Sequence, residues 1–174
     1  ADIARLTGQS EQRTRDVADM QRLQKDLAQG QQQLQQGVEE RMRQLEPTKV
    51  TVDGREITAE PAERRAYDAA MASFRAGDFA DAQSGYLGLI SRYPKSGYLP
   101  SALFWLGNAQ YALRDYKEAI SNFRIMLSAD SDHVRAPEAM LSIANCQIEL
   151  KDLRAARKTL EDLTKRYPQS EAAV

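Results

Sequence analysis

From Glu63 onward, apolar residues recur every three or four positions, and the whole arrangement returns every 37 residues. The period brings four sets of residues into register: Asp78, Asp115 and Asp152; Ala82, Ala119 and Ala156; Tyr86, Phe123 and Leu160; Ala70, Gly107 and Ala144. Each period contains two stretches that are apolar on one face, which predicts a pair of helices. Because such a pair cannot bury its apolar face alone, it stacks on its neighbours. The sequence therefore predicts an all-α solenoid of three helix-turn-helix repeats, at about residues 63–99, 100–136 and 137–174.

The middle repeat carries the clearest pattern, in residues 102–128. It resembles the tetratricopeptide repeat (TPR), whose order of Leu-Gly, Tyr, Ala and an aromatic residue is met by Leu106-Gly107, Tyr111, Ala119 and Phe123. Small residues stand where two helices must approach closely, and large ones fill the space around them. The outer repeats match more loosely, with Ala70 and Ala144 in place of the glycine. The period exceeds the usual one of about 34 residues, so each inter-repeat loop is expected to be about three residues longer.

Aspartates and prolines mark the expected helix starts. Asp78, Asp115 and Asp152 each precede a second helix, and Asp115 has Glu118 at the spacing of a capping box. Capping accounts for all three aspartates at once, so it is preferred to paired catalytic carboxylates. Pro100 and Pro137 suit the first turn of a first helix. From Ser170 another helical stretch is expected to begin, as a final cap that is cut short or disordered.

Residues 1–46 follow a different, seven-residue pattern that predicts a coiled-coil oligomerisation helix. Its seam consists of Ile3, Leu6, Val17, Met20, Gln24, Leu27, Gln31, Leu34, Val38 and Leu45, and is interrupted by Ser10, Arg13 and Arg41. Gln24 and Gln31 are expected to form hydrogen-bonded layers between parallel strands, which favours a homotrimer over a dimer. The alternative is a solvated helix in a monomer.

Residues 47–62 break the helical pattern. Pro47 stops the coil, and Val50-Thr-Val52, Asp53-Gly54 and Arg55-Glu-Ile57 have the form of a hairpin with a two-residue turn. Because a lone hairpin is barely stable, we interpret the segment as a linker whose strands are transient or docked.

Composition points away from catalysis. Net charge is −1, which gives no sign of nucleic-acid or anionic-membrane binding, and no apolar run approaches the length of a membrane span. The single cysteine, Cys146, is expected to be a small packed core residue. The single histidine, His133, has no evident catalytic partner, and with Asp130 and Asp132 it is interpreted as a solvated turn. We therefore expect no enzyme, no metal and no cofactor.

Binding is the favoured role, since stacked helix pairs curve and the first helices line the concave face. The partner-binding residues predicted there are Tyr67, Met71, Phe74, Arg75, Phe104, Asn108, Tyr111, Asn145 and Ile148, with Ala112, Leu141 and Glu149 beside them. The equivalent amides of Asn108 and Asn145 suit the backbone of a bound peptide. Each aromatic side chain has packing between helices as its alternative role.

The order of the parts carries a more specific resemblance. A Gln-rich coiled coil and a Val-Thr-Val-Asp-Gly linker precede three repeats, with Arg92-Tyr-Pro-Lys-Ser96, Leu103-Phe-Trp-Leu-Gly107 and Arg166-Tyr-Pro-Gln-Ser170 as the most specific segments. This arrangement resembles the CpoB family, the cell-division coordinators of the Tol-Pal system in Gram-negative bacteria. The closure of the middle repeat, Ala129-Asp-Ser-Asp-His133, departs from that pattern.

The resemblance implies a non-catalytic periplasmic protein whose signal peptide has been removed, consistent with a start at Ala-Asp-Ile. It also implies trimers, and repeats that engage TolA and a bifunctional peptidoglycan synthase, coupling outer-membrane constriction to septal wall synthesis in the cell cycle. Two alternatives are open. One is a generic TPR adaptor or co-chaperone scaffold with an unrelated partner, and the other is a structural oligomeriser whose concave face binds nothing.

Overall fold

The computed structural model describes residues 2–43 and 45–174, with the side chains of residues 2, 4, 5 and 7 excepted. The chain divides into two compact units, residues 1–46 and 47–174. The first unit contains one long helix, α1 (Asp2–Arg43). The coiled coil predicted from the sequence also takes in residues 1 and 44, which lie outside the described part.

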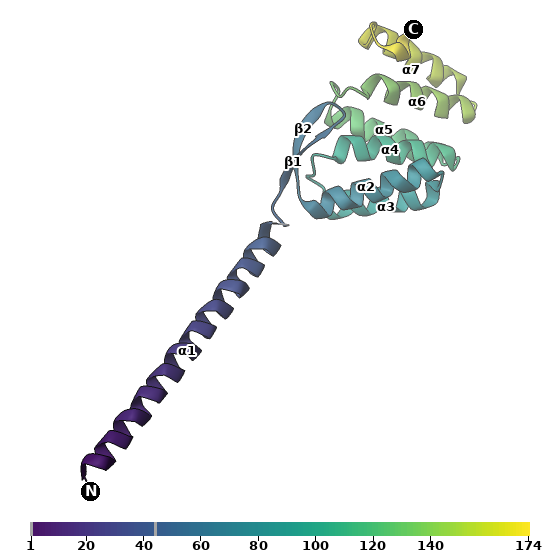
Figure 1. The fold of residues 1–174 in the computed structure, drawn as a ribbon. Coiled ribbons are helices and arrows are strands. Elements are labelled where there is room, and N and C mark those ends of the chain that lie inside the picture. Colours follow the sequence, from purple (N-terminus) through teal and green to yellow (C-terminus); the bar gives the residue numbers. More distant parts are fainter. Residues whose placement is uncertain (1, 44) are drawn as a thin grey trace. The chain divides into compact units, whose positions relative to one another are not determined.

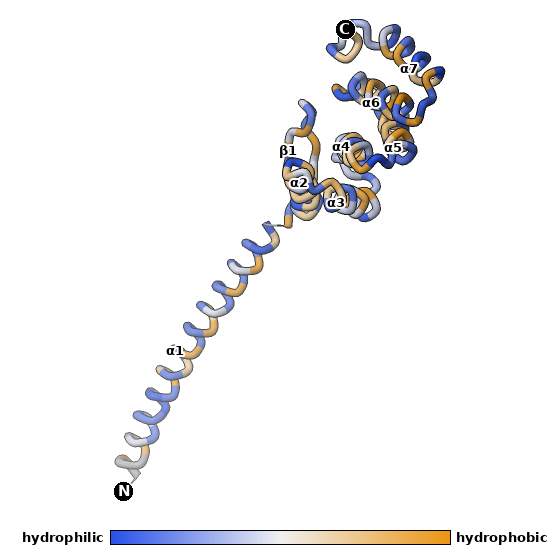
Figure 2. Tube along the Cα trace, turned by 90° about the vertical axis from the view of Figure 1, so that its right-hand side faces the viewer, coloured by the Kyte–Doolittle hydropathy of each residue, from blue (hydrophilic) through white to orange (hydrophobic). Residues whose placement is uncertain are grey.

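Helix α1 buries none of its apolar seam within its own chain. Leu27 and Leu34 are each 70% exposed, and Val38 is 48% exposed. Apolar residues recur along the tube of α1 in Figure 2 between longer hydrophilic stretches. Helices in proteins gain most of their stability when their apolar face packs against another element. The exposed seam of α1 is therefore expected to pack against other helices.

The second unit holds six helices in antiparallel pairs, which confirms the predicted all-α repeat architecture. The pairs are α2 (Pro61–Ala76) with α3 (Phe79–Arg92), α4 (Leu99–Ala112) with α5 (Tyr116–Ala129), and α6 (Ala136–Glu149) with α7 (Leu153–Arg166). They stack in chain order, α3 on α4 and α5 on α6, as Figure 1 shows. A short 3-10 turn, η1 (Glu171–Ala173), follows α7 and packs against α6 and α7.

Each helix pair depends on close approach at the predicted small positions. A Cβ added to Gly107 would lie 2.7 Å from the Phe123 ring, which is fully buried. In the first pair, the same test on Gly85 gives 2.9 Å to the Cβ of Ala70. The small residues therefore set the distance between the helices, and the large ones fill the core beside them.

A polar bridge also recurs between paired helices. Gln110 Oε1 accepts a hydrogen bond from Asn122 Nδ2 at 2.8 Å, and 37 residues later Gln147 Oε1 accepts one from Thr159 Oγ1, also at 2.8 Å. Gln110 and Gln147 are both 5% exposed, so these bonds satisfy groups that would otherwise be buried and unpaired.

The turns between paired helices repeat as well. Gly77, Arg114 and Lys151 stand 37 residues apart and all have positive φ, at 84°, 66° and 63°. Pro100 and Pro137 lie in the first turns of α4 and α6, as predicted.

The capping prediction holds at only one of its three positions. Asp152 accepts a hydrogen bond from the Ala155 N–H at 3.1 Å, whereas Asp78 and Asp115 make no side-chain capping bond, so the predicted capping box at Asp115 is not formed. All three aspartates do sit at the N-cap, where the backbone carbonyl accepts the first helical bond. The side chains of Asp78 and Asp115 are both exposed.

Gly107 provides a test of the close approach. We expect Gly107→Ala to lower the free energy of unfolding by about 1–3 kcal/mol, because the new methyl group has no space beside the Phe123 ring. The matched change Gly88→Ala, in α3 with open space around it, is expected to raise stability by up to about 1 kcal/mol through helix propensity. Urea denaturation followed by fluorescence of Trp105, the only tryptophan, measures both. Equal effects at the two glycines would contradict the packing argument.

Candidate binding groove

A β-hairpin begins the second unit. Strands β1 (Thr48–Val52) and β2 (Arg55–Ala59) pair antiparallel, with Val52 opposite Arg55. The two turn residues, Asp53 and Gly54, have φ of 48° and 77°. Positive φ at both positions defines the type I′ turn, for which Asp-Gly is a preferred sequence.

The hairpin is docked on the repeats. Its apolar side chains Val50, Val52, Ile57 and Ala59 pack against the core of the first repeats. At Gly97, in the α3–α4 loop, an added Cβ would lie 2.8 Å from Ile57, so only a glycine lets this loop meet the hairpin so closely. Of the two states left open by the sequence, transient or docked, the structure has the docked one (Figure 1).

The tip of the hairpin is held by polar contacts with the α5–α6 loop. Asp53 Oδ1 accepts a hydrogen bond from Arg135 Nε at 2.7 Å. Arg55 donates to the carboxylate of Asp130 and, at 3.0 Å, to the backbone carbonyl of Asp132. Asp53 is 7% exposed and Arg135 is 28% exposed, so their pair lies largely out of water.

The α5–α6 loop is therefore not the solvated turn that the sequence suggested. His133 is only 6% exposed, because the hairpin covers it. Its Nδ1 accepts a hydrogen bond from the Arg135 N–H at 3.2 Å, just as Ser96 Oγ accepts one from the Tyr98 N–H at 3.1 Å in the preceding repeat. The middle closure keeps the local turn of the repeat but exchanges its residues for ones that hold the hairpin.

Arg135 is held by its ion pair with Asp53 and by contact with two aromatic rings. Its guanidinium lies 5.2 Å from the Phe104 ring centroid and 5.0 Å from that of Trp105. Burial disfavours the charge, but the hydrogen bond and attraction from Asp53, with Glu138 beside it, raise the pKa of Arg135 overall. The arginine thus joins a buried carboxylate to two aromatic faces.

His133 responds to the same charges in the opposite sense. Burial lowers the pKa of His133 below its ordinary 6.5, and Asp53 and Asp130 only partly offset this. Since Nδ1 accepts a hydrogen bond, the neutral ring carries its proton on Nε2, which lies 3.7 Å from Asp53 Oδ2. That carboxylate oxygen is buried and makes no hydrogen bond within the described part of the chain.

Between the hairpin and the first helices lies a groove of about 380 Å³. Hairpin residues form one wall and α2 residues the other, with α4 and the start of α6 between them; the lining residues are Thr51, Val52, Asp53, Tyr67, Asp68, Met71, Ala72, Arg75, Trp105 and Arg135. We call this the hairpin groove. Its aromatic floor and paired acidic and basic groups suit a peptide better than a small apolar molecule.

The predicted concave-face residues fall into three groups. Tyr67, Met71 and Phe104 are buried; Phe74, Asn108 and Tyr111 are half-buried; Arg75, Asn145 and Ile148 are exposed. The buried aromatic residues serve packing, the alternative noted above: Tyr67 stacks on Tyr98 at 4.5 Å between ring centroids. The predicted partner site as a whole stays a prediction.

The predicted amides also differ. Asn108 Nδ2 donates to the Phe104 carbonyl of its own helix at 2.9 Å, whereas Asn145 is exposed with no bond of that kind. Tyr67, Met71 and Arg75 meet in the hairpin groove, while Ile148 lines a separate apolar hollow with Leu153 and Leu160 on α7.

Sequence reasoning missed Trp105 and Arg135 as groove residues. A signal for Arg135 was present, because it stands where the preceding repeat has Tyr98 and follows the one closure that departs from Tyr-Pro-x-Ser. No periodic signal separates Trp105 from a core residue.

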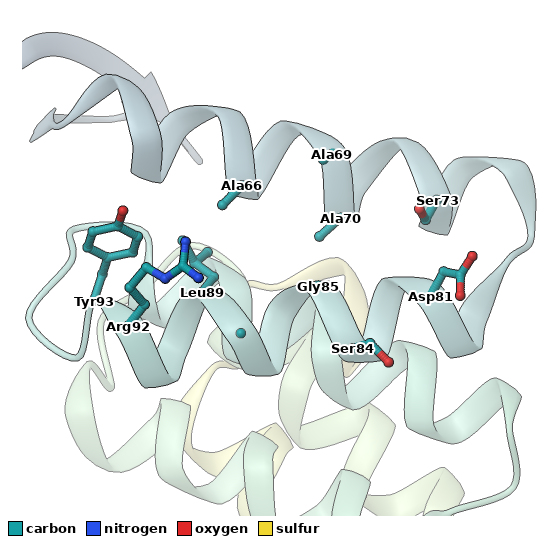
Figure 3. Close-up of a pocket in the computed structure, with 11 residues that line it drawn as sticks. Ala66, Ala69, Ala70, Ser73, Asp81, Ser84, Gly85, Leu89, Arg92 and Tyr93 are labelled. Atoms are coloured by element: carbon teal, nitrogen blue, oxygen red, sulfur yellow. The ribbon is translucent and has the colours of Figure 1, made fainter. Parts of the chain in front are cut away.

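A second hollow runs between α2 and α3, as Figure 3 shows. Small residues line it, among them Ala66, Ala69, Ser73 and Gly85. Ser73 and Gly85 stand where later repeats place Gln110 and Asn122, so the first repeat lacks the polar bridge and is open there. A small-residue hollow of this kind is a packing feature.

The one cysteine is not placed as a reactive thiol. Cys146 is fully buried, and burial raises the pKa of its thiol to about 11. Across residues 2–43 and 45–174, no cluster of His, Cys, Asp and Glu is suited to a metal ion. None of the helices in the described part combines the length and apolar character that a bilayer crossing requires.

Comparisons with known proteins agree with the repeat geometry. Two family models, each described as a tetratricopeptide repeat, match residues 67–134 and 110–174. No curated protein sequence matches the chain significantly.

Solved structures give the same fold. The chain is similar to the TPR2B domain of yeast Sti1 in its complex with pHsp70, at 23% identity and a TM-score of 0.52, covering 60% of this chain and 78% of that one. It is similar to PcrH from Pseudomonas aeruginosa, at 20% identity and a TM-score of 0.55, covering 66% and 83%. PcrH in complex with the chaperone binding region of PopB gives 20% identity and a TM-score of 0.56, covering 66% and 88%.

Stacked antiparallel helix pairs define a helical-repeat interaction scaffold. The chain is a tetratricopeptide-repeat protein with a long N-terminal helix, of a class that binds protein partners and is typically non-catalytic.

The buried histidine predicts a pH effect. Because the pKa of His133 is lowered in the fold, the unfolded chain takes up the proton first. The neutral His133 ring contributes its full stabilisation above pH 6.5, and this contribution is lost as the pH falls through the folded-state pKa. We expect the melting temperature of the repeat unit to fall more between pH 7.5 and 5.5 in the wild type than in His133→Ser. Serine is the residue of the equivalent turn at Ser96 and keeps its hydrogen-bond acceptor. Parallel declines, followed by Trp105 fluorescence, would contradict this role.

Proposed function

We propose that this interaction scaffold belongs to the CpoB family and acts in the periplasm, as part of the Tol-Pal system in cell division. The order of its parts carries the proposal: a Gln-rich helix, a Val-Thr-Val-Asp-Gly hairpin and three TPR repeats, of which the first and third end in Tyr-Pro-x-Ser. In this role the protein couples outer-membrane constriction to septal peptidoglycan synthesis. Its partners are TolA and a bifunctional peptidoglycan synthase.

Helix α1 supplies the oligomeric form, a parallel homotrimer. Support comes from its exposed apolar seam, with Leu27, Leu34 and Leu45 all at 69–70% exposure. Gln24 and Gln31 lie in that seam one heptad apart, where polar layers select register and strand number at some loss of stability.

The open part of the concave face is the proposed partner site. The hairpin and Arg135 lie against Tyr67 and Phe104. Among the predicted partner-binding residues, the exposed side chains are those of Arg75, Asn145 and Ile148. Support comes from the exposed amide of Asn145 beside an exposed apolar side chain, a pairing that suits a peptide backbone and its side chains.

The alternative is a generic TPR adaptor or co-chaperone scaffold. The fold likeness to a domain of yeast Sti1 solved with pHsp70, and to PcrH solved with a region of PopB, favours it as a second candidate. Subcellular fractionation of the native host distinguishes the two, since the Tol-Pal role requires the periplasmic fraction.

Affinity capture from a Gram-negative envelope extract tests the partners. We expect the full chain to retain TolA or a bifunctional peptidoglycan synthase, and Asn145→Arg/Ile148→Glu to lose it about tenfold or more. The matched control Ser121→Arg/Ile125→Glu introduces the same two residues at exposed positions of α5, and it is expected to bind normally.

The outcomes separate role from site. Equal binding by all three baits supports the Tol-Pal role but places the site elsewhere. Absence of these partners from the wild-type bait contradicts the Tol-Pal role and leaves the scaffold class.

Sedimentation tests the trimer. We expect the wild-type chain of 19.5 kDa to sediment at three times its mass, and Leu27→Glu/Leu34→Glu to sediment as a monomer, because charges in the seam repel across the strands. The control Gln29→Glu/Gln36→Glu adds the same charge at positions outside the seam and should stay trimeric. A monomeric wild type, or a seam variant of unchanged mass, would contradict the coiled coil.

A further inference from the structure

The free edge of β1 is the one strand edge that borders the hairpin groove. In a hairpin with a two-residue turn, the residues that flank the turn exchange both backbone hydrogen bonds, and bonded and non-bonded pairs then alternate. Val52 and Arg55 are that closing pair. It follows that Lys49 and Thr51 direct their N–H and C=O groups away from β2. The sheet has only these two strands within the described residues, so this edge has no neighbouring strand.

The groove brings this edge opposite helix α2. Thr51, Val52 and Asp53 line one wall, and Asp68, Met71, Ala72 and Arg75 line the other. The α2 residues span two helical turns, or roughly 10 Å, which is the length of about three residues of a strand. The groove is thus long enough for one short extended segment between β1 and α2.

We propose that β1 is a docking strand, and that an extended segment of a partner protein adds to it as a third strand within the hairpin groove. This inference rests on the proposed function as a protein-binding scaffold and names the conformation of the bound segment. A helical segment satisfies its own backbone groups, so it would leave those of Lys49 and Thr51 unpaired. An extended segment pairs with them directly, and free strand edges are ready templates for such pairing.

The lining defines the chemistry of the segment. Its inward side chains meet Tyr67, Met71 and Trp105, so alternate positions are apolar. Arg75 lies in the groove and is exposed, and it forms no ion pair within the part of the chain that the structure describes. The segment therefore carries a carboxylate within reach of Arg75.

The docking strand is held in place before binding. The hairpin is anchored through Asp53 and Arg55 at its tip, and through Ile57 and Ala59 against the core. A fixed edge loses little conformational entropy when a partner strand pairs with it, which favours binding.

Proline substitution tests the edge selectively. Thr51 and Glu56 face each other across the hairpin, and both direct their N–H groups outward, Thr51 toward the groove edge and Glu56 toward the opposite edge. Thr51→Pro removes the donor that the bound strand needs. Glu56→Pro makes the same change at the other edge, and in both cases the bonds between β1 and β2 are kept. Equal melting temperatures of the two variants establish that any difference in binding comes from the edge.

The probe is a displayed library of random twelve-residue peptides, selected on the full wild-type chain. We expect selected peptides to lose about tenfold or more in affinity on Thr51→Pro and to bind Glu56→Pro normally. N-methylation at alternate peptide residues is expected to abolish binding with a period of two. Arg75→Glu is expected to weaken binding of acidic peptides and to be compensated by a Glu→Lys change in the peptide.

Selection of no peptide, or equal binding to Thr51→Pro and the wild type, would overturn the proposal. Peptides that lose affinity on Asn145→Arg/Ile148→Glu but not on Thr51→Pro would overturn it too, while the open concave face would stand as the site. The affinity capture of TolA and the peptide selection are independent experiments. Failure of the Tol-Pal role and failure of the docking strand are therefore distinguishable.

Discussion

The buried ion pair between Asp53 and Arg135 is the contact on which the arrangement of the second unit depends. It joins residues 82 positions apart, the hairpin turn and the start of α6. The guanidinium also covers the rings of Phe104 and Trp105, so one side chain links the hairpin, the second repeat and the third. Loss of Arg135 leaves the Asp53 carboxylate, 7% exposed, without its closest cationic partner, and breaking a buried pair in this way typically costs about 3–5 kcal/mol. Together with the Arg55 contacts and the packing of Ile57 and Ala59, this pair holds the groove wall formed by β1 in place.

The same pair explains why the middle repeat breaks the pattern of its neighbours. A Tyr-Pro-x-Ser closure there would put Tyr, Pro and Ser at positions 130, 131 and 133, with no carboxylate for Arg55 and no imidazole beside Asp53. The local turn survives the exchange, since His133 Nδ1 takes the part that Ser96 Oγ plays one repeat earlier. A departure from a repeat is therefore informative: it marks where the solenoid contacts something outside itself.

The sequence predicted what local pattern determines. Helix pairs, their period and the close approach at Gly107 follow from residue size and spacing, and the Asp53-Gly54 turn follows from its backbone preference. Docking of the hairpin was not predictable in the same way, because it depends on contacts between distant residues. For that reason His133 was misread as solvated, although it is 6% exposed. For Tyr67 and Phe104 the sequence left packing open as an alternative, because the repeat pattern predicts them on the concave face but carries no information about what lies against it.

The predicted concave-face residues consequently divide into two groups with different surroundings. Where the hairpin lies against the first helices, the aromatic residues are largely covered, and the free edge of β1 borders the groove. Beyond the hairpin, Asn145 and Ile148 of α6 face solvent. A strand edge pairs with peptide backbone, and the groove beside it contacts alternate side chains, whereas Asn145 offers an amide to backbone and Ile148 an apolar contact. A partner that spans both surfaces would combine backbone pairing at the first with further backbone and side-chain contacts at the second.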